Sequence, residues 1–186
     1  MEINYTAKSM TDAVTSIYTR LYELLCIHTK LNILAMSAMQ SMGYNGFKRW
    51  HRYRSHQYMK LKLKVRTEMY DKFRLIPNFK DVEISYSPKS MEEHLKSWES
   101  AILSAIQELG TVNKDFYETA GINCKIAKCA MCKMMKDYEK VGRYYKRFTE
   151  SDWLTLDMHI VDDSIHEKFK KKEARYEYKG RTEKGL

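Results

Sequence analysis

Apolar residues recur at intervals of three and four over most of this chain, the spacing that gathers them on one side of an α-helix. Five such stretches occur, over about residues 11–40, 46–74, 90–120, 123–149 and 151–172. The first is apolar nearly all round, which is typical of a buried helix. The sequence therefore predicts an all-α fold.

Short local signals mark where these helices begin and end. Two glycines close together, Gly43 and Gly46, predict a turn after the first helix. Ser90 followed three residues later by Glu93 is the capping-box pattern of a helix start, and Gly121 predicts a helix end.

The inward faces of the second and fourth helices can be predicted residue by residue. In the second helix the apolar residues follow one another at intervals of three or four residues. The one exception is a longer interval that contains Arg54. The inward residues there are predicted to be Phe47, Trp50, Tyr58, Leu61, Val65, Met69 and Phe73. In the fourth helix they are predicted to be Ala127, Met131, Met134, Tyr138, Val141, Tyr145 and Phe148.

The connection between the second and third helices, residues 75–89, contains both prolines and an extended-looking run at 82–86. A helix of about 29 residues is about 43 Å long, and about fifteen extended residues reach at most about 50 Å. A hairpin would need only a few residues. The connection therefore predicts that these two helices run parallel, joined by one long crossover, which is the ferritin-like arrangement of a four-helix bundle.

Several stretches resemble the ferritin family. Gly46–Trp50 followed by His51–Lys64 resembles the start of the ferritin second helix, Trp98–Ile102 resembles the opening of its third helix, and Tyr117–Ala120 resembles that helix's end. The resemblance covers about residues 18–148. It implies a ferritin-like four-helix bundle with a C-terminal fifth helix, related to ferritins or to the smaller DNA-protecting mini-ferritins.

Ferritins oxidise iron at a site formed by a Glu on the first helix, a Glu-x-x-His on the second and a Glu on the third. The resemblance places the Glu-x-x-His positions at Tyr58 and Leu61, and the single glutamates nearest to Glu23 and Glu108. A phenol can supply one oxygen and a leucine none, whereas iron sites of this kind need carboxylates and imidazoles.

The resemblance thus implies iron binding or storage with a degenerate, weak or inactive ferroxidase centre. Its ligands would be Glu23, Tyr58 and Glu108. Iron is then the candidate cofactor, and any enzymatic activity would be Fe(II) oxidation, which the replaced ligands disfavour. Glu23 and Glu108 can also be interpreted as partly exposed carboxylates with basic partners.

Two further groups have metal-ligand or thiol chemistry. His159, Asp163 and His166 share one side of the predicted fifth helix, where they could hold a divalent ion or form a solvated face. Cys129 and Cys132 lie among lysines, which favour thiolates, so zinc or redox use competes with ordinary surface cysteines. Cys124, Cys129 and Cys132 also have the spacing of three iron–sulfur cluster ligands, and Cys26 could be the fourth. However, the loops that hold such clusters are irregular, whereas these three cysteines lie in a predicted helix.

The chain is basic, with a formal net charge of +9, and its second helix carries much of the excess. Ten lysines or arginines lie between Gly46 and Arg74, against two acidic residues. Such a surface could bind nucleic acid non-specifically or face acidic residues of a neighbouring subunit. The candidate nucleic-acid residues are Lys48, Arg49, Arg52, Lys60 and Lys64. The second hypothesis is therefore a non-enzymatic scaffold or DNA-associated bundle that retains the fold without the metal site.

Length and composition predict one domain over residues 1–172, followed by a basic tail at 173–186. No apolar run approaches the about 20 residues that span a bilayer, and the N-terminus has no signal-peptide pattern. The four cysteines do not form a secreted disulfide pattern. A cytoplasmic protein that self-associates and has no membrane partner is expected.

Overall fold

The computed structural model describes residues 3–74, 83–121, 123–148, 153–155 and 157, with side chains described from residue 12 to 144 of these ranges and at 153–155 and 157. In these ranges the chain is all-α, as the apolar spacing predicted. The four helices are α1 (Ile3–Ser41), α2 (Asn45–Phe73), α3 (Met91–Ala120) and α4 (Lys125–Phe148).

Little of the predicted fifth helix falls within the described residues. Residues 153–155 and 157 are helical. His159, Asp163 and His166, and the tail at 173–186, lie outside the described part of the chain, so the surface metal site expected there stays a prediction.

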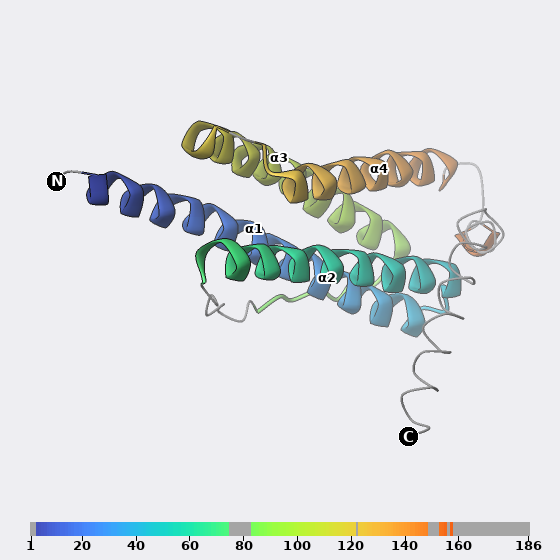
Figure 1. Ribbon diagram of the computed structural model, residues 1–186. Coiled ribbons are helices and arrows are strands. Elements are labelled where there is room, and N and C mark those ends of the chain that lie inside the picture. The colour runs from blue at the N-terminus through green and yellow to red at the C-terminus, as the bar shows by residue number, and fades with distance from the viewer. Residues whose placement is uncertain (1–2, 75–82, 122, 149–152, 156, 158–186) are drawn as a thin grey trace, which may run out of the picture.

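The helices are arranged with α2 and α3 parallel, as the length of the connection predicted (Figure 1). The Tyr18 hydroxyl on α1 donates to Glu68 near the end of α2, so these two helices are antiparallel. His51 and His94 meet near the starts of α2 and α3, and both helices run in the same direction from there (Figure 1). Helix α1 packs on α2 and α3, and α4 packs on the same two helices.

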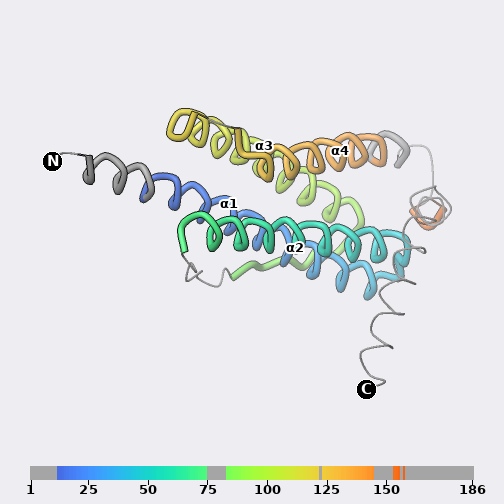
Figure 2. Tube along the Cα trace, viewed as in Figure 1, coloured from blue at the N-terminus to red at the C-terminus, as the bar shows by residue number. Residues whose placement is uncertain are grey.

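The segment at 83–90, which leads into α3, runs beside the α1–α2 pair (Figure 2). Its residues 83–85 share the lining of a surface pocket with Lys30, Ile33 and Leu34 of α1. None of the described helices combines the length and apolar character needed to cross a bilayer.

The predicted helix ends of α3 are confirmed. The Ser90 hydroxyl accepts from the Glu93 backbone N–H at 3.2 Å, and the Glu93 carboxylate accepts from the Lys89 N–H at 2.8 Å. At the other end Gly121 has φ +67° and its N–H donates to the Tyr117 carbonyl. Glycine adopts this left-handed conformation without the steric cost of a Cβ atom.

The start of α2 is capped from a distant part of the chain. Its N-cap residue, Tyr44, makes no side-chain capping bond. The buried carboxylate of Asp157 instead accepts from the Gly46 N–H at 2.9 Å and from the Phe47 N–H at 2.8 Å. A carboxylate here satisfies two otherwise unpaired donors and is favoured by the helix dipole. A Cβ atom at residue 46 would collide with the Asp157 backbone carbonyl, so only glycine permits this approach.

We expect Asp157→Asn to lower the free energy of unfolding by about 1–2 kcal/mol, because it removes a charge and one acceptor from the start of α2. Urea denaturation followed by circular dichroism measures this. Asp71→Asn, at an exposed position near the end of α2, is the control and should leave stability nearly unchanged. An Asp157→Asn midpoint equal to that of the native protein would contradict the cap.

Candidate functional site

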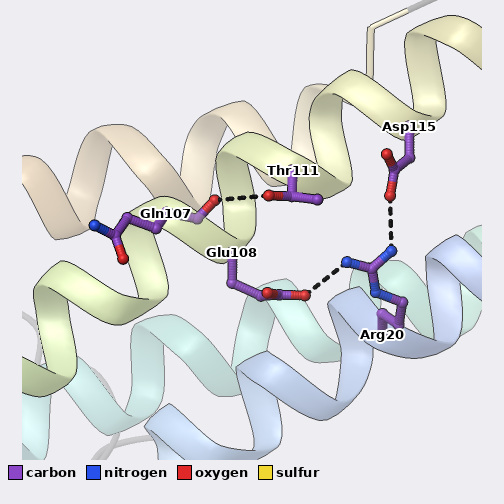
Figure 3. A network of polar contacts seen from close by, with 5 residues as sticks. All are labelled: Arg20, Gln107, Glu108, Thr111 and Asp115. Atoms are coloured by element: carbon purple, nitrogen blue, oxygen red, sulfur yellow. Dashed lines mark hydrogen bonds and ion pairs between the residues drawn. The ribbon is translucent and has the colours of Figure 1, made fainter.

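The predicted ligand Glu108 lies half-exposed at the α1–α3 contact. Arg20 of α1 donates to Glu108 at 2.8 Å and to Asp115 at 2.7 Å, so one guanidinium joins two carboxylates of α3 (Figure 3). The two ion pairs raise the pKa of Arg20. Glu108 therefore has the basic partner that its second interpretation anticipated.

The other two predicted ligands have different surroundings. Glu23 is half-buried on α1, where its charge adds to the rise that burial causes in the pKa of the Cys26 thiol. Tyr58 is buried on α2 and donates to Asp137 of α4 at 3.2 Å. Tyr58 and Glu108 thus bond to partners on different helices. No group of three His, Cys, Asp or Glu that could hold a metal ion occurs in the described residues.

A buried ion pair lies next to Tyr58, one of the two positions at which the resemblance places second-helix ligands. The Arg54 guanidinium of α2 pairs with the Asp137 carboxylate of α4, whose side chain is fully buried. Arg54 also donates to Gln57 at 2.9 Å, and Lys133 of α4 reaches the same amide oxygen at 3.3 Å. We call Arg54, Gln57, Tyr58, Lys133 and Asp137 the arginine cluster.

Burial dominates the electrostatics of the arginine cluster. It raises the pKa of Asp137 to about 6, even though the Arg54 charge acts in the opposite direction. Burial and the Asp137 charge raise the pKa of Tyr58. Above pH 6 Arg54 and Asp137 therefore form a cation–anion pair, with the neutral Tyr58 phenol bonded to the anion.

A second buried polar group crosses three helices and the segment before α3. The Asn32 carboxamide oxygen of α1 lies 3.1 Å from His51 Nδ1 of α2, and His51 Nε2 lies 3.1 Å from His94 Nε2 of α3. The Tyr86 hydroxyl lies 2.5 Å from His94 Nδ1. We call Asn32, His51, His94 and Tyr86 the histidine relay.

Asn32 fixes the direction of every hydrogen bond in the histidine relay. Its amide N–H donates to the His28 backbone carbonyl at 2.7 Å, so its oxygen faces His51 and must accept. His51 then carries its proton on Nδ1 and accepts at Nε2 from His94 Nε2–H. That leaves His94 Nδ1 as an acceptor for the Tyr86 hydroxyl, and each polar group has a partner when both rings are neutral.

The surroundings keep both rings neutral. His51 and His94 are fully buried, and the ring of Trp98 lies 4.6 Å from that of His51. Burial lowers the pKa of His94 to about 3, and burial with the nearby His94 and Arg54 lowers that of His51. His28 is a third buried imidazole: burial lowers its pKa to about 4, and its Nδ1 has no hydrogen-bond partner among the described residues.

The predicted thiol pair lies at the surface. Cys129 and Cys132 are exposed on α4, whereas Cys124 is buried just before that helix and Cys26 is half-buried on α1. Burial raises the pKa of Cys124. The cysteines of the iron–sulfur spacing are therefore divided between core and surface, and zinc or redox use of Cys129 and Cys132 stays a prediction.

The predicted nucleic-acid residues lie together on α2. Arg49, Arg52, Lys60 and Lys64 are exposed, and Lys48 is half-buried. These side chains face away from the core stripe that contains Trp50, Tyr58 and Val65.

Sequence reasoning missed Arg54 and Asp137. The gap in the apolar spacing of α2 was the available signal, because residue 54 fills the inward position between Trp50 and Tyr58. On α4, Tyr138 was predicted inward and is instead exposed, with Asp137 in the core. This expectation was wrong because an aspartate can occupy a core position when a buried arginine lies opposite it.

Acid should destabilise the protein through its buried histidines. Their pKa values are below the ordinary 6.5, so below that pH the unfolded chain binds protons that the folded chain excludes. Stability is therefore complete above pH 6.5 and falls by about 2 kcal/mol per buried histidine between pH 7.5 and 5. The raised pKa of Asp137 acts in the opposite direction and offsets part of one such loss.

Urea denaturation from pH 5 to 7.5 measures this dependence. We expect His28→Leu to reduce the slope of the free energy of unfolding against pH by the equivalent of about one proton, because the substitution removes one site that is protonated only in the unfolded chain. His56→Gln, at an exposed position, is the control and should leave the slope unchanged. Equal slopes for all three proteins would contradict the assignment of His28 as a neutral buried imidazole.

The arginine cluster should show strong coupling between its two charges. Arg54→Met should cost about 3–5 kcal/mol at pH 7.5, because it leaves the Asp137 carboxylate buried without its cation. The double variant Arg54→Met/Asp137→Leu should recover most of this loss. Arg20→Met, which removes the half-exposed pairs to Glu108 and Asp115, is the control and should cost about 0–1 kcal/mol. Purely additive losses in the double variant would contradict a coupled pair.

Comparison with models of known protein families gives no match for this chain, and comparison with curated proteins gives none.

Proposed function

We propose that this chain is a ferritin-like bundle acting as a non-enzymatic scaffold, in which an arginine side chain supplies the interior positive charge that iron supplies in a ferritin. One observation carries the proposal. The buried Arg54–Asp137 pair is hydrogen-bonded to Tyr58, one of the two inward positions of the second helix at which the ferritin resemblance places metal ligands.

The arrangement of the helices supports the ferritin-like part of the proposal. Each of α1 and α4 packs on both α2 and α3, and α2 runs parallel to α3. A long single connection between parallel second and third helices is the arrangement of ferritin-like bundles. The stretches of α2 and α3 that resemble ferritin also contain the core residues Trp50 and Trp98.

The donor groups around Tyr58 do not suit Fe(II). A divalent ion next to Tyr58 would lie beside the Arg54 guanidinium, and the two cations would repel each other strongly in a buried site. The Asp137 carboxylate is already neutralised by Arg54, and Leu61, buried one turn from Tyr58, has no donor atom. The nitrogens of His51 and His94 are occupied by the histidine relay.

Anaerobic Fe(II) titration by calorimetry, followed by exposure to air, tests the proposal. We expect no stoichiometric binding and no oxidation above the buffer rate. Glu108→Gln is the informative variant, because the competing iron-handling function needs Glu23, Tyr58 and Glu108 as ligands. Stoichiometric Fe(II) binding that this substitution abolishes would overturn the scaffold proposal in favour of iron handling.

A further inference from the structure

Charge is distributed unequally among the four helices. Helix α2 has nine lysines or arginines against two acidic residues, and α4 has eight against two. Helix α3 has two lysines or arginines against six acidic residues, and α1 has three against two acidic residues. The positive excess of the protein therefore belongs mainly to α2 and α4.

These two basic helices are neighbours. Tyr58 bonds to Asp137 and Lys133 to Gln57 across their contact, and the rings of Phe47 and Tyr144 lie 5.6 Å apart. The early part of α2 thus lies against the later part of α4. The outer surfaces of the two helices therefore adjoin.

Exposed cations line these adjoining surfaces along both helices. We call the two surfaces together the basic face and define it by exposed residues of each helix: Arg49, Lys60 and Lys64 of α2 with Lys128, Lys136 and Arg143 of α4. From Arg49 to Lys64 the face extends about 22 Å at 1.5 Å per residue. Duplex DNA carries one phosphate charge per about 1.7 Å of its axis, so a surface of this length can meet several phosphates.

Among the described residues, six of the ten acidic residues of α2, α3 and α4 already have cationic partners of their own. Within α2 and α4, Glu68 pairs with Lys72, and Asp137 is buried with Arg54. On α3, four of the six carboxylates have cationic partners within the chain. Glu108 and Asp115 pair with Arg20, Glu92 with Lys96, and Glu118 with Lys114. The acidic helix of a second copy is therefore a poor partner for the basic face, and an external polyanion is favoured.

We propose that the basic face binds the phosphate backbone of duplex nucleic acid without sequence specificity, and that α4 contributes to this binding as much as α2 does. Lysine and arginine side chains that neutralise phosphates release condensed counterions, so the affinity must fall steeply with salt. The proposal goes beyond the scaffold function and does not depend on whether the interior binds iron.

Fluorescence anisotropy with a labelled 30-base-pair duplex over a salt series tests this surface. Arg49→Gln/Lys64→Gln removes two charges from α2, and Lys136→Gln/Arg143→Gln removes two from α4. We expect each pair to weaken binding about tenfold or more at low salt and to reduce the slope of log K against log salt by about 2. Circular dichroism checks that each variant retains its helices.

Lys96→Gln/Lys114→Gln on α3 is the matched control, because it removes the same charge from two exposed lysines outside the basic face. It should leave the slope unchanged. No binding of the native protein at low salt would overturn the proposal, as would equal losses in all three variants or a loss confined to the α2 pair. Binding to anionic vesicles without binding to DNA, or self-association by light scattering that the α2 and α4 pairs abolish without DNA binding, would also overturn it.

Discussion

A charged side chain inside a helix bundle is tolerated only when an opposite charge is buried beside it, and Arg54 and Asp137 meet this condition across the α2–α4 contact. The pair constrains more than its own two positions. Because the guanidinium must reach the carboxylate, α2 and α4 can slide past each other very little without leaving a buried charge unpaired. Tyr58 tightens this requirement by donating to the same carboxylate. Hydrophobic packing would accept several registers of two helices, whereas the ion pair accepts one.

The histidine relay likewise restricts how α1, α2 and α3 can pack, but through neutral hydrogen-bonding groups instead of charges. Its direction begins at the His28 carbonyl, which orients the Asn32 amide. Each later donor is then determined by the one before it, until the Tyr86 hydroxyl closes the series at His94. Since a reversed hydrogen bond would place two donors or two acceptors together in a buried site, α1, α2, α3 and the segment at 83–90 must assemble in one mutual arrangement. Burial of His51 next to Arg54 also keeps the interior from accepting a further proton.

The features predicted from sequence were those determined by neighbours in the chain. Apolar spacing located the helices, Ser90 and Glu93 marked the start of α3, and Gly121 marked its end. The missed features depend on residues far away in sequence. Asp137 is a core residue only because Arg54 lies opposite, and Asp157 caps α2 across 111 positions. A periodicity analysis assigns charged residues to the surface, so it moved the core stripe of α4 from Asp137 to Tyr138. The ferritin resemblance directed attention to Tyr58, and only the structure showed which groups surround it.

The inside and the outside of α2 now have separate explanations. Inward, Arg54 is the one cation on the core stripe of α2, and its charge is matched by Asp137. Outward, Arg49, Lys60 and Lys64 of α2 are exposed, and both α2 and the neighbouring α4 carry few acidic residues. If the outer charges existed only for solubility, they could be distributed over all four helices at lower mutual repulsion. Their concentration on two adjacent helices raises the local potential on one side alone, and that side is where a polyanion would reduce the repulsion among them.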